Sequence, residues 1–364
     1  MATSHTSLAP QVGQGVGHTQ AIPVTSAPIS PIVSDEVRHI LFTILVQVGQ
    51  LVIASFGILS NVVNIIVYFK MGFSETSSVT LTALALTDLL TEIWLVLMAA
   101  SLQSHYTGAQ VTPLSVTIMY LLSTASNAVL GYGSWITAII STERCLCIVF
   151  PLKVKSIFTV RRITMLLTVV LIIQLVSIIP TYATIELTYV QSPLTNRSTL
   201  VLARSEYSLY VETITMFALF TIPSVICFSI VVICTIFLVV KLNQSAKWRQ
   251  STSNATQGQE GTMSTKENRV VRTVVLICAI YIFCFAPNVL TVTTMAAYPD
   301  FNETDPYLGN LLSVCFIIAF PCHAICSAVN IFVYLGMSTK YRETFVKLFC
   351  PKKKKLNGAL DKKP

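Results

Sequence analysis

The residues with the clearest chemical potential are charged side chains that interrupt apolar sequence. Glu143 and Arg144 stand side by side near the end of the apolar stretch Pro113–Pro151, and Asp88 lies in the middle of another. Charged groups are costly in hydrocarbon, so those found there usually have a functional role. A simpler interpretation of the Glu143–Arg144 pair is an interfacial anchor, because charged side chains near span ends often reach to water. Whether Glu143 and Arg144 have a functional role or only anchor the span depends on the elements that carry them.

The composition indicates that these elements are membrane spans. The chain has 364 residues, is 53% hydrophobic and only 11% charged, and has a mean hydropathy of +0.70. A soluble domain does not need so much apolar surface. A helix crosses a bilayer with about 20 mostly apolar residues. Seven stretches qualify: Ile40–Phe69, Ser77–Leu102, Leu114–Val149, Ile163–Ala183, Tyr207–Val240, Val270–Ala297 and Tyr307–Leu335. The sequence therefore predicts an all-α membrane protein, a seven-transmembrane helix bundle.

The basic residues predict the orientation of this bundle. Only Arg38, Arg197 and Arg204 fall on one side, and the other 24 − 3 = 21 Lys and Arg residues fall on the opposite side. Lys and Arg are enriched in cytoplasmic loops, so we expect an extracellular amino terminus in the plasma membrane. The net charge of +8 belongs to this inner face, where it favours anionic membrane lipids rather than nucleic acid.

The ends of the chain differ from the spans in composition. Residues 1–37 are rich in Ser, Thr, Gly, Gln and Pro and predict a disordered extracellular tail before the transmembrane domain, residues 38–338. Residues 339–350 place Tyr341, Phe345 and Phe349 on one helical face, which predicts a short amphipathic eighth helix on the membrane surface. Cys350 is then a candidate palmitoylation site. Residues 351–364 form a basic cytoplasmic tail.

Several motifs in the spans have the spacing of one receptor family. They are Gly57 with Asn61, Leu84-Ala85-Leu86-Thr87-Asp88-Leu89, Glu143-Arg144-Cys145, Cys284-Phe285-Ala286-Pro287 and Asn330-Ile331-Phe332-Val333-Tyr334. Over Ile40–Cys350 the chain resembles the rhodopsin-like (class A) G-protein-coupled receptors, and among them invertebrate neuropeptide or chemosensory receptors. It departs from the family at Cys145 for Tyr, Phe285 for Trp and Ile331 for Pro, and its second outer loop has no cysteine for the usual disulfide.

The resemblance implies an activation switch at the inner ends of the helices. Arg144 and Leu152 are expected to contact a heterotrimeric G protein, and Glu267 is expected to pair with Arg144 in the resting state. The alternative for Glu267 and Arg144 is two unrelated solvated charges. Pro287 removes a backbone hydrogen bond and bends the sixth span. The resemblance assigns the switch to Glu143, Arg144, Glu267, Phe285, Pro287, Asn330 and Tyr334.

The aspartate in the second span has two interpretations. By resemblance, Asp88 binds an allosteric sodium ion with Ser327 and Asn330, although Gly133 stands where the family often has a serine ligand. The alternative is a neutral, protonated structural aspartate. No other cofactor is expected.

Residues expected in the outer halves of the spans indicate which ligands the protein binds and where. Ser126 replaces the aspartate of amine receptors and Ala324 replaces the retinal lysine of opsins, so neither ligand is expected. The outer loops carry seven acidic residues against three basic ones, which favours a basic neuropeptide or a cationic chemosensory compound. An internal hydrogen bond is the simpler role for any single one of these polar residues. The predicted ligand-binding residues are Glu92, Ser126, Asn127, Glu212, Asn288 and His323.

Other functional classes fit the sequence less well. A seven-span secondary transporter of a small cationic solute is the alternative, but the halves show no inverted repeat. The chain lacks the metal-binding and nucleophile motifs of intramembrane enzymes, so no enzymatic activity is expected. Asn196 and Asn302 lie in glycosylation sequons on the predicted outer side.

Overall fold

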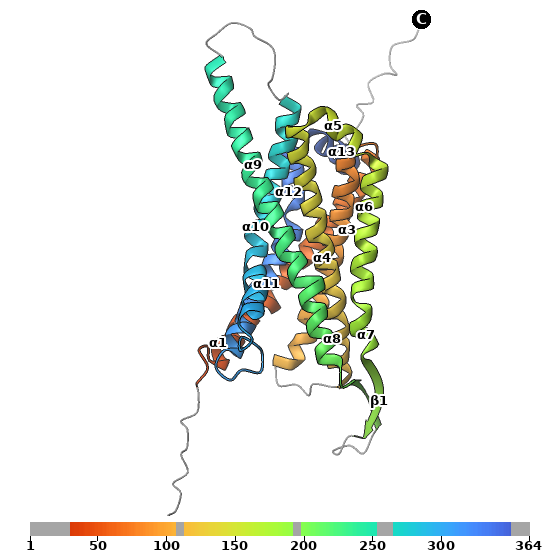
Figure 1. Ribbon diagram of the computed structural model, residues 1–364, viewed down its shortest axis with the longest axis vertical. Helices are drawn as coiled ribbons and strands as arrows, with labels where there is room; N and C mark the ends of the chain where they lie inside the picture. Colours follow the sequence, from red (N-terminus) through yellow and green to blue (C-terminus); the bar gives the residue numbers. More distant parts are fainter. Residues whose placement is uncertain (1–29, 107–112, 192–197, 253–264, 351–364) are drawn as a thin grey trace, which may run out of the picture.

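The computed structural model describes residues 30–106, 113–191, 198–252 and 265–350. They form an elongated bundle of long helices whose axes run along the length of the molecule (Figure 1). A two-stranded hairpin lies at one end, which we call the hairpin end. The short helix α13 lies at the other end, together with the last turns of α4, which carry Arg144, and we call it the Arg144 end. Residues 1–29 and 351–364, which include most of the predicted outer tail and the basic inner tail, lie outside the described residues.

The helices follow the predicted spans closely. Among the described residues, six helical segments are long and apolar enough to cross a membrane. The central helix α4 completes the seven-helix bundle. In chain order the spans are α1–η1–α2 (Asp35–Leu41, Phe42–Gln50, Leu51–Met71), α3 (Thr76–Tyr106), α4 (Pro113–Val149), α6–α7 (Val160–Ser177, Ile179–Ala183), α8–η2–α9 (Ser208–Thr215, Met216–Thr221, Ile222–Thr252), α10 (Thr265–Ala297) and α11–α12 (Gly309–Ala328, Asn330–Met337).

Local sequence signals mark where the helices begin and end. The side chains of Ser34 and Thr159 accept hydrogen bonds from the first turns of α1 and α6, as N-caps do. Gly72 ends α2 with a φ of +81°, a conformation that favours glycine. Pro151 begins α5 (Pro151–Ile157) directly after α4, because a residue before proline is disfavoured in a helix.

The interior and the lipid-facing surface separate around α4. Ile136 of α4, Ile163 of α6 and Leu238 of α9 are almost completely buried and belong to one apolar cluster. Large apolar side chains such as Leu59 and Phe283 point outward, with exposed fractions of 68% and 80%. Such an apolar exterior is suited to lipid and would be unfavourable in water.

Four of the spans, the first, fourth, fifth and seventh, are not continuous α-helices, which the sequence did not predict. The first and fifth spans contain π-helical segments, η1 and η2. The seventh span is interrupted at Val329, between α11 and α12, although Ile331 replaces the family's proline. A further proline, Pro321, lies inside α11. The seventh span is therefore interrupted at this point even though the motif proline is absent.

The second loop at the hairpin end forms regular structure without a disulfide. Strands β1 (Ile185–Gln191) and β2 (Ser198–Arg204) pair antiparallel, with Thr188 opposite Val201. All ten cysteines of the chain are free, and none lies in this hairpin. Backbone pairing therefore organises the loop in this chain.

Candidate functional site

Helix α4 positions Glu143 and Arg144 at the Arg144 end, two turns before its last residue. Glu143 is 3% exposed, and the Arg144 side chain is 14% exposed. The two form an ion pair with 3.4 Å between Arg144 Nη2 and Glu143 Oε1. A buried charge is tolerated when it is paired and hydrogen-bonded. These side chains therefore require partners from neighbouring elements.

The start of α3 supplies those partners. Thr76 Oγ1 donates a hydrogen bond to Glu143 Oε1 at 2.5 Å, and Arg144 Nη2 donates to Ser77 Oγ. Both contacts join residues adjacent in α3 to residues adjacent in α4. A hydrogen bond to a charged group contributes about 1.5–3 kcal/mol. The two bonds hold the arginine against the second span, an arrangement that the sequence did not predict.

Glu267 of the predicted switch and Leu152, a predicted G-protein contact, have side chains outside the described part of the structure. Glu267 belongs to the first turns of α10 and Leu152 to α5, but only their backbone placement is described. The pairing of Glu267 with Arg144 and the contact role of Leu152 therefore stay predictions.

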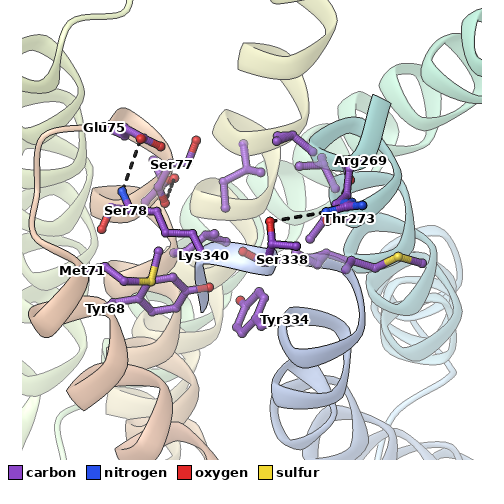
Figure 2. Close-up of a pocket in the computed structure, with 18 of the residues that line it drawn as sticks. Tyr68, Met71, Glu75, Ser77, Ser78, Arg269, Thr273, Tyr334, Ser338 and Lys340 are labelled. Carbon is purple, nitrogen blue, oxygen red and sulfur yellow. Dashed lines mark hydrogen bonds and ion pairs between the residues drawn. The ribbon is translucent and has the colours of Figure 1, made fainter. Parts of the chain in front are cut away.

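A cavity of about 510 Å³ opens beside Arg144 (Figure 2). Met71, Leu81, Ile140 and Ile277 contribute apolar lining from four helices, and Arg144 contributes a charged group. Cavities of about 300–1,000 Å³ with a few polar groups are typical of binding sites. We call this space the inner cavity.

Charged residues surround the mouth of the inner cavity. Lys340 Nζ lies 3.3 Å from Glu75 Oε1, and Arg269 Nη1 donates to Thr339 Oγ1 at 3.4 Å (Figure 2). These contacts join α13 (Thr339–Phe349) to the loop before α3 and to the start of α10. Helix α13 thus forms one side of the opening.

A second polar group lies in the middle of the bundle, which we call the polar centre: Asp88, Ser327 and Asn330. Asn330 Nδ2 donates to Asp88 Oδ2 at 2.8 Å, and the Ser327 hydroxyl also interacts with this carboxylate. A cavity of about 30 Å³ adjoins all three residues and Gly133. It is large enough for a water molecule or a small ion. The oxygen atoms around it are of the type that hard cations take as ligands, so they fit a sodium ion.

The sixth and seventh spans meet through an aromatic stack beside this centre. Phe285 lies between Tyr281 and His323, with ring centroids 4.3 and 4.6 Å away. It precedes Pro287, which lies inside α10 as predicted. Sequence reasoning missed the stack because Tyr281 and His323 belong to no motif. The only signal in the sequence for this stack was that both residues are aromatic and lie about one helical turn from positions of the family motifs.

Two predicted ligand residues are enclosed in the bundle. Glu92 and His323 are 0% and 2% exposed. Within the described part of the chain, neither the Glu92 carboxylate oxygens nor the His323 ring nitrogens have a hydrogen-bond partner. Glu92 points at the first span: a Cβ atom on Gly57 would lie 2.3 Å from Glu92 Oε1. A side chain at position 57 would therefore require the Glu92 carboxylate to move.

The other predicted ligand residues lie closer to the hairpin end. Asn127 Nδ2 approaches Met216 Sδ at 3.7 Å, and Glu212 lies one turn before Met216 in the same span. Asn127, Glu212 and Asn288 are all partly exposed, whereas Ser126 is buried and bonds to the carbonyl of Ser123. Asn127 of the third span thus contacts the fifth span, which also carries Glu212.

The predicted modification sites lie at opposite ends of the molecule. Asn302 is partly exposed, and its side chain bonds to Thr304 and to the backbone of Pro299. Cys350 is exposed directly after α13. Asn196 lies outside the described residues. Glycosylation and palmitoylation at these positions stay predictions.

Comparison with known proteins identifies the family. The model of the family described as 7 transmembrane receptor (rhodopsin family) matches residues 60–334, which contain the polar centre, the Glu143–Arg144 pair and Tyr334. A comparison with curated proteins gives no match. This match covers most of the chain and agrees with the helix bundle and with the motifs in it. The chain belongs to the rhodopsin family of seven-transmembrane receptors, and it is a multi-pass membrane protein of the receptor class.

Proposed function

We propose that this receptor binds a cationic extracellular ligand, a basic neuropeptide or a cationic chemosensory compound, and activates a heterotrimeric G protein. The observation that carries the proposal is the inner cavity, because it places a restrained arginine beside a space of binding-site size. We place the Arg144 end in the cytoplasm, because 21 of the 24 Lys and Arg residues belong to the predicted inner side and basic residues are enriched in cytoplasmic loops.

Activation exchanges the partners of Arg144. In the structure this arginine bonds to Glu143 and Ser77. We propose that ligand binding favours a state in which the inner end of α10 moves away by bending at Pro287. Arg144 then turns to the G protein, together with Leu152. Bonds of about 1–3 kcal/mol bias such an equilibrium without locking it.

The ligand preference rests on the acidic residues of the hairpin end. Asp35 pairs with Arg38 at 3.0 Å, and Asp305 accepts hydrogen bonds from the backbone of Tyr307 and Leu308, so these two have structural roles. The remaining outer acids are exposed and available to attract a cation: Glu36, Glu186, Glu206, Asp300 and Glu303. An excess of exposed negative charge raises the encounter rate with cationic ligands.

The polar centre provides a regulatory site in this proposal. Asp88, Ser327 and Asn330 would hold a sodium ion, which when bound supplies a positive charge that stabilises the ionised carboxylate of Asp88. The bond from Asn330 to Asp88 holds the second and seventh spans together.

The proposal is tested by screening basic peptides and small amines on cells that express the receptor with a promiscuous G-protein reporter. A responding compound is then applied to the Glu212→Gln and Glu92→Gln variants at equal surface expression. We expect Glu212→Gln to weaken the response at least tenfold, because Glu212 is a partly exposed acidic residue within a span. If both variants respond like the wild type, the pocket assignment is wrong. Uptake of the compound without second-messenger change contradicts the receptor function.

A further inference from the structure

Three consecutive residues at the start of α13 contact three different spans. Thr339 accepts from Arg269 of α10 at 3.4 Å, Lys340 pairs with Glu75 before α3 at 3.3 Å, and Tyr341 bonds to Asn64 of α2 at 2.6 Å. The first two contacts are exposed and lie at the mouth of the inner cavity (Figure 2). The third is buried, and the Tyr341 side chain is 0% exposed. The buried hydrogen bond of Tyr341 therefore attaches this turn of α13 to α2.

The bond made by Tyr341 is the first of a continuous series. The Tyr341 hydroxyl donates to Asn64 Oδ1 at 2.6 Å, and Asn64 Nδ2 donates to Asn61 Oδ1 at 3.2 Å. Asn61 Nδ2 in turn donates to the backbone oxygen of Ser327 at 3.1 Å and to that of Gly57 at 3.0 Å. Both asparagines are 0% exposed. Buried amides with satisfied hydrogen bonds hold a defined geometry.

This series ends at the polar centre. Ser327 interacts with Asp88, and Asn330, three residues further along, donates to the same carboxylate at 2.8 Å. The series thus joins the Asp88 carboxylate in the middle of the bundle to the helix that carries Thr339 and Lys340 at the cavity mouth.

The hydroxyl of Tyr341 can be separated from the packing of its ring. The ring lies 5.4 Å from those of both Tyr68 and Tyr334, centroid to centroid. A phenylalanine would retain these contacts and remove only the donor to Asn64. The loss would leave the buried Asn64 Oδ1 without that partner, which is destabilising for a buried acceptor.

We infer that the Tyr341 hydroxyl is a positioning group for coupling: it transmits the state of the polar centre to α13, and α13 in turn sets the mouth of the inner cavity. The inference rests on the proposed function, since the cavity is the proposed docking site of the G protein. Tyr341 acts through Asn64 and Asn61 and itself contacts neither ligand nor transducer.

The first experiment measures amide hydrogen exchange in α13 of the full-length receptor in lipid nanodiscs. Tyr341→Phe is expected to speed exchange of the α13 amides about fivefold, because one buried hydrogen bond is lost. It is also expected to raise the G-protein concentration for half-maximal nucleotide exchange about fivefold. The control is Tyr182→Phe, which removes a tyrosine hydroxyl bonded to the backbone of Leu121 far from α13; it should leave α13 unchanged.

The second experiment tests transmission rather than local stability. Asp88→Asn weakens the bond with Asn330, so in the wild-type background it should speed α13 exchange at least twofold. In the Tyr341→Phe background the same change should speed α13 exchange less than 1.3-fold, because the hydrogen bond that transmits the effect is already absent. Asn64→Ala combined with Tyr341→Phe should add nothing to either single variant. Equal effects of Asp88→Asn in both backgrounds, or unchanged exchange in Tyr341→Phe, overturn the inference. Amide hydrogen exchange in α13 is measured without a G protein. Failure of the receptor to couple to a G protein would therefore contradict the proposed function without affecting this test.

Discussion

The Arg144 end and the surroundings of Glu92 accommodate buried ionisable side chains in opposite ways. Glu143 and Arg144 pair with each other and with Thr76 and Ser77 of the neighbouring span. Glu92, in contrast, has no hydrogen-bond partner among the described residues and is enclosed by packing against Gly57. Contacts that can be exchanged are suited to a switch, whereas enclosure by packing resists movement. The comparison predicts that mutations around Glu92 affect folding and that mutations at the Arg144 end affect signalling.

The largest expected effect follows from filling the space that Glu92 occupies. Gly57→Ala places a Cβ atom within 2.3 Å of Glu92 Oε1, so overpacking should lower the stability of the receptor by about 1–3 kcal/mol. Thermal unfolding in nanodiscs measures this loss. Gly336→Ala is the matched control, because a Cβ atom there has no neighbour within 4 Å.

A second variant identifies the cause of that loss. Adding Glu92→Ala to Gly57→Ala removes the clashing carboxylate and should restore most of the stability. An unchanged melting temperature in Gly57→Ala, or no recovery in the double variant, would show that Glu92 does not fill this space.

The next effect concerns the bonds that restrain Arg144. Thr76→Val removes the donor to Glu143 with little change of shape, so it should raise ligand-independent signalling up to about tenfold. Thr82→Val is the control, since the Thr82 hydroxyl donates to the backbone oxygen of Ser78 in its own helix and Thr82 is not among the described residues that line the inner cavity. Equal basal activity of the two variants, at equal surface expression, argues against a restraint by α3.

The predicted partner on α10 gives a smaller expected effect. Glu267→Ala should raise basal signalling about fivefold if Glu267 shares the restraint of Arg144 with α3, since a paired charge contributes about 1–3 kcal/mol. Basal activity at or below the wild-type level, measured with equal receptor at the surface, rules out the pairing and leaves the restraint to Thr76 and Ser77 alone.

The smallest effect is expected at the mouth of the inner cavity. Lys340 and Glu75 form an exposed pair, with side chains 48% and 60% exposed. Exposed pairs contribute about 0–1 kcal/mol and are weakened by salt. Lys340→Ala should therefore change basal nucleotide exchange less than twofold, and raising the salt concentration should remove the difference. A larger change that persists in high salt would place this pair among the principal restraints.

Sequence reasoning predicted the spans because long apolar stretches have few alternatives to a membrane helix. It also predicted the motif residues Asp88, Arg144 and Asn330, whose neighbours in sequence carry the family pattern. It did not predict the β1–β2 hairpin, because alternating residues in a loop without cysteines give only a weak strand signal.

Contacts between spans could not be predicted from the sequence for a different reason. The direction in which Glu92 points depends on the rotation of α3 about its axis, and the bond of Tyr341 to Asn64 joins residues 277 positions apart. The partners of Glu143 and Arg144 in α3 were missed likewise, because Thr76 and Ser77 resemble many other residues near span ends. Such pairings are set by tertiary packing rather than by local pattern.

The most direct measurement of the central claim is nucleotide exchange on a purified heterotrimeric G protein by the wild-type receptor and by Arg144→Gln in nanodiscs. The control Arg162→Gln removes an arginine whose guanidinium donates to backbone oxygens of Ser156 and Ile157 outside the inner cavity. We predict that Arg144→Gln lowers the exchange rate at least tenfold while Arg162→Gln leaves it within twofold of the wild type. Equal exchange by the wild type and Arg144→Gln would contradict the account.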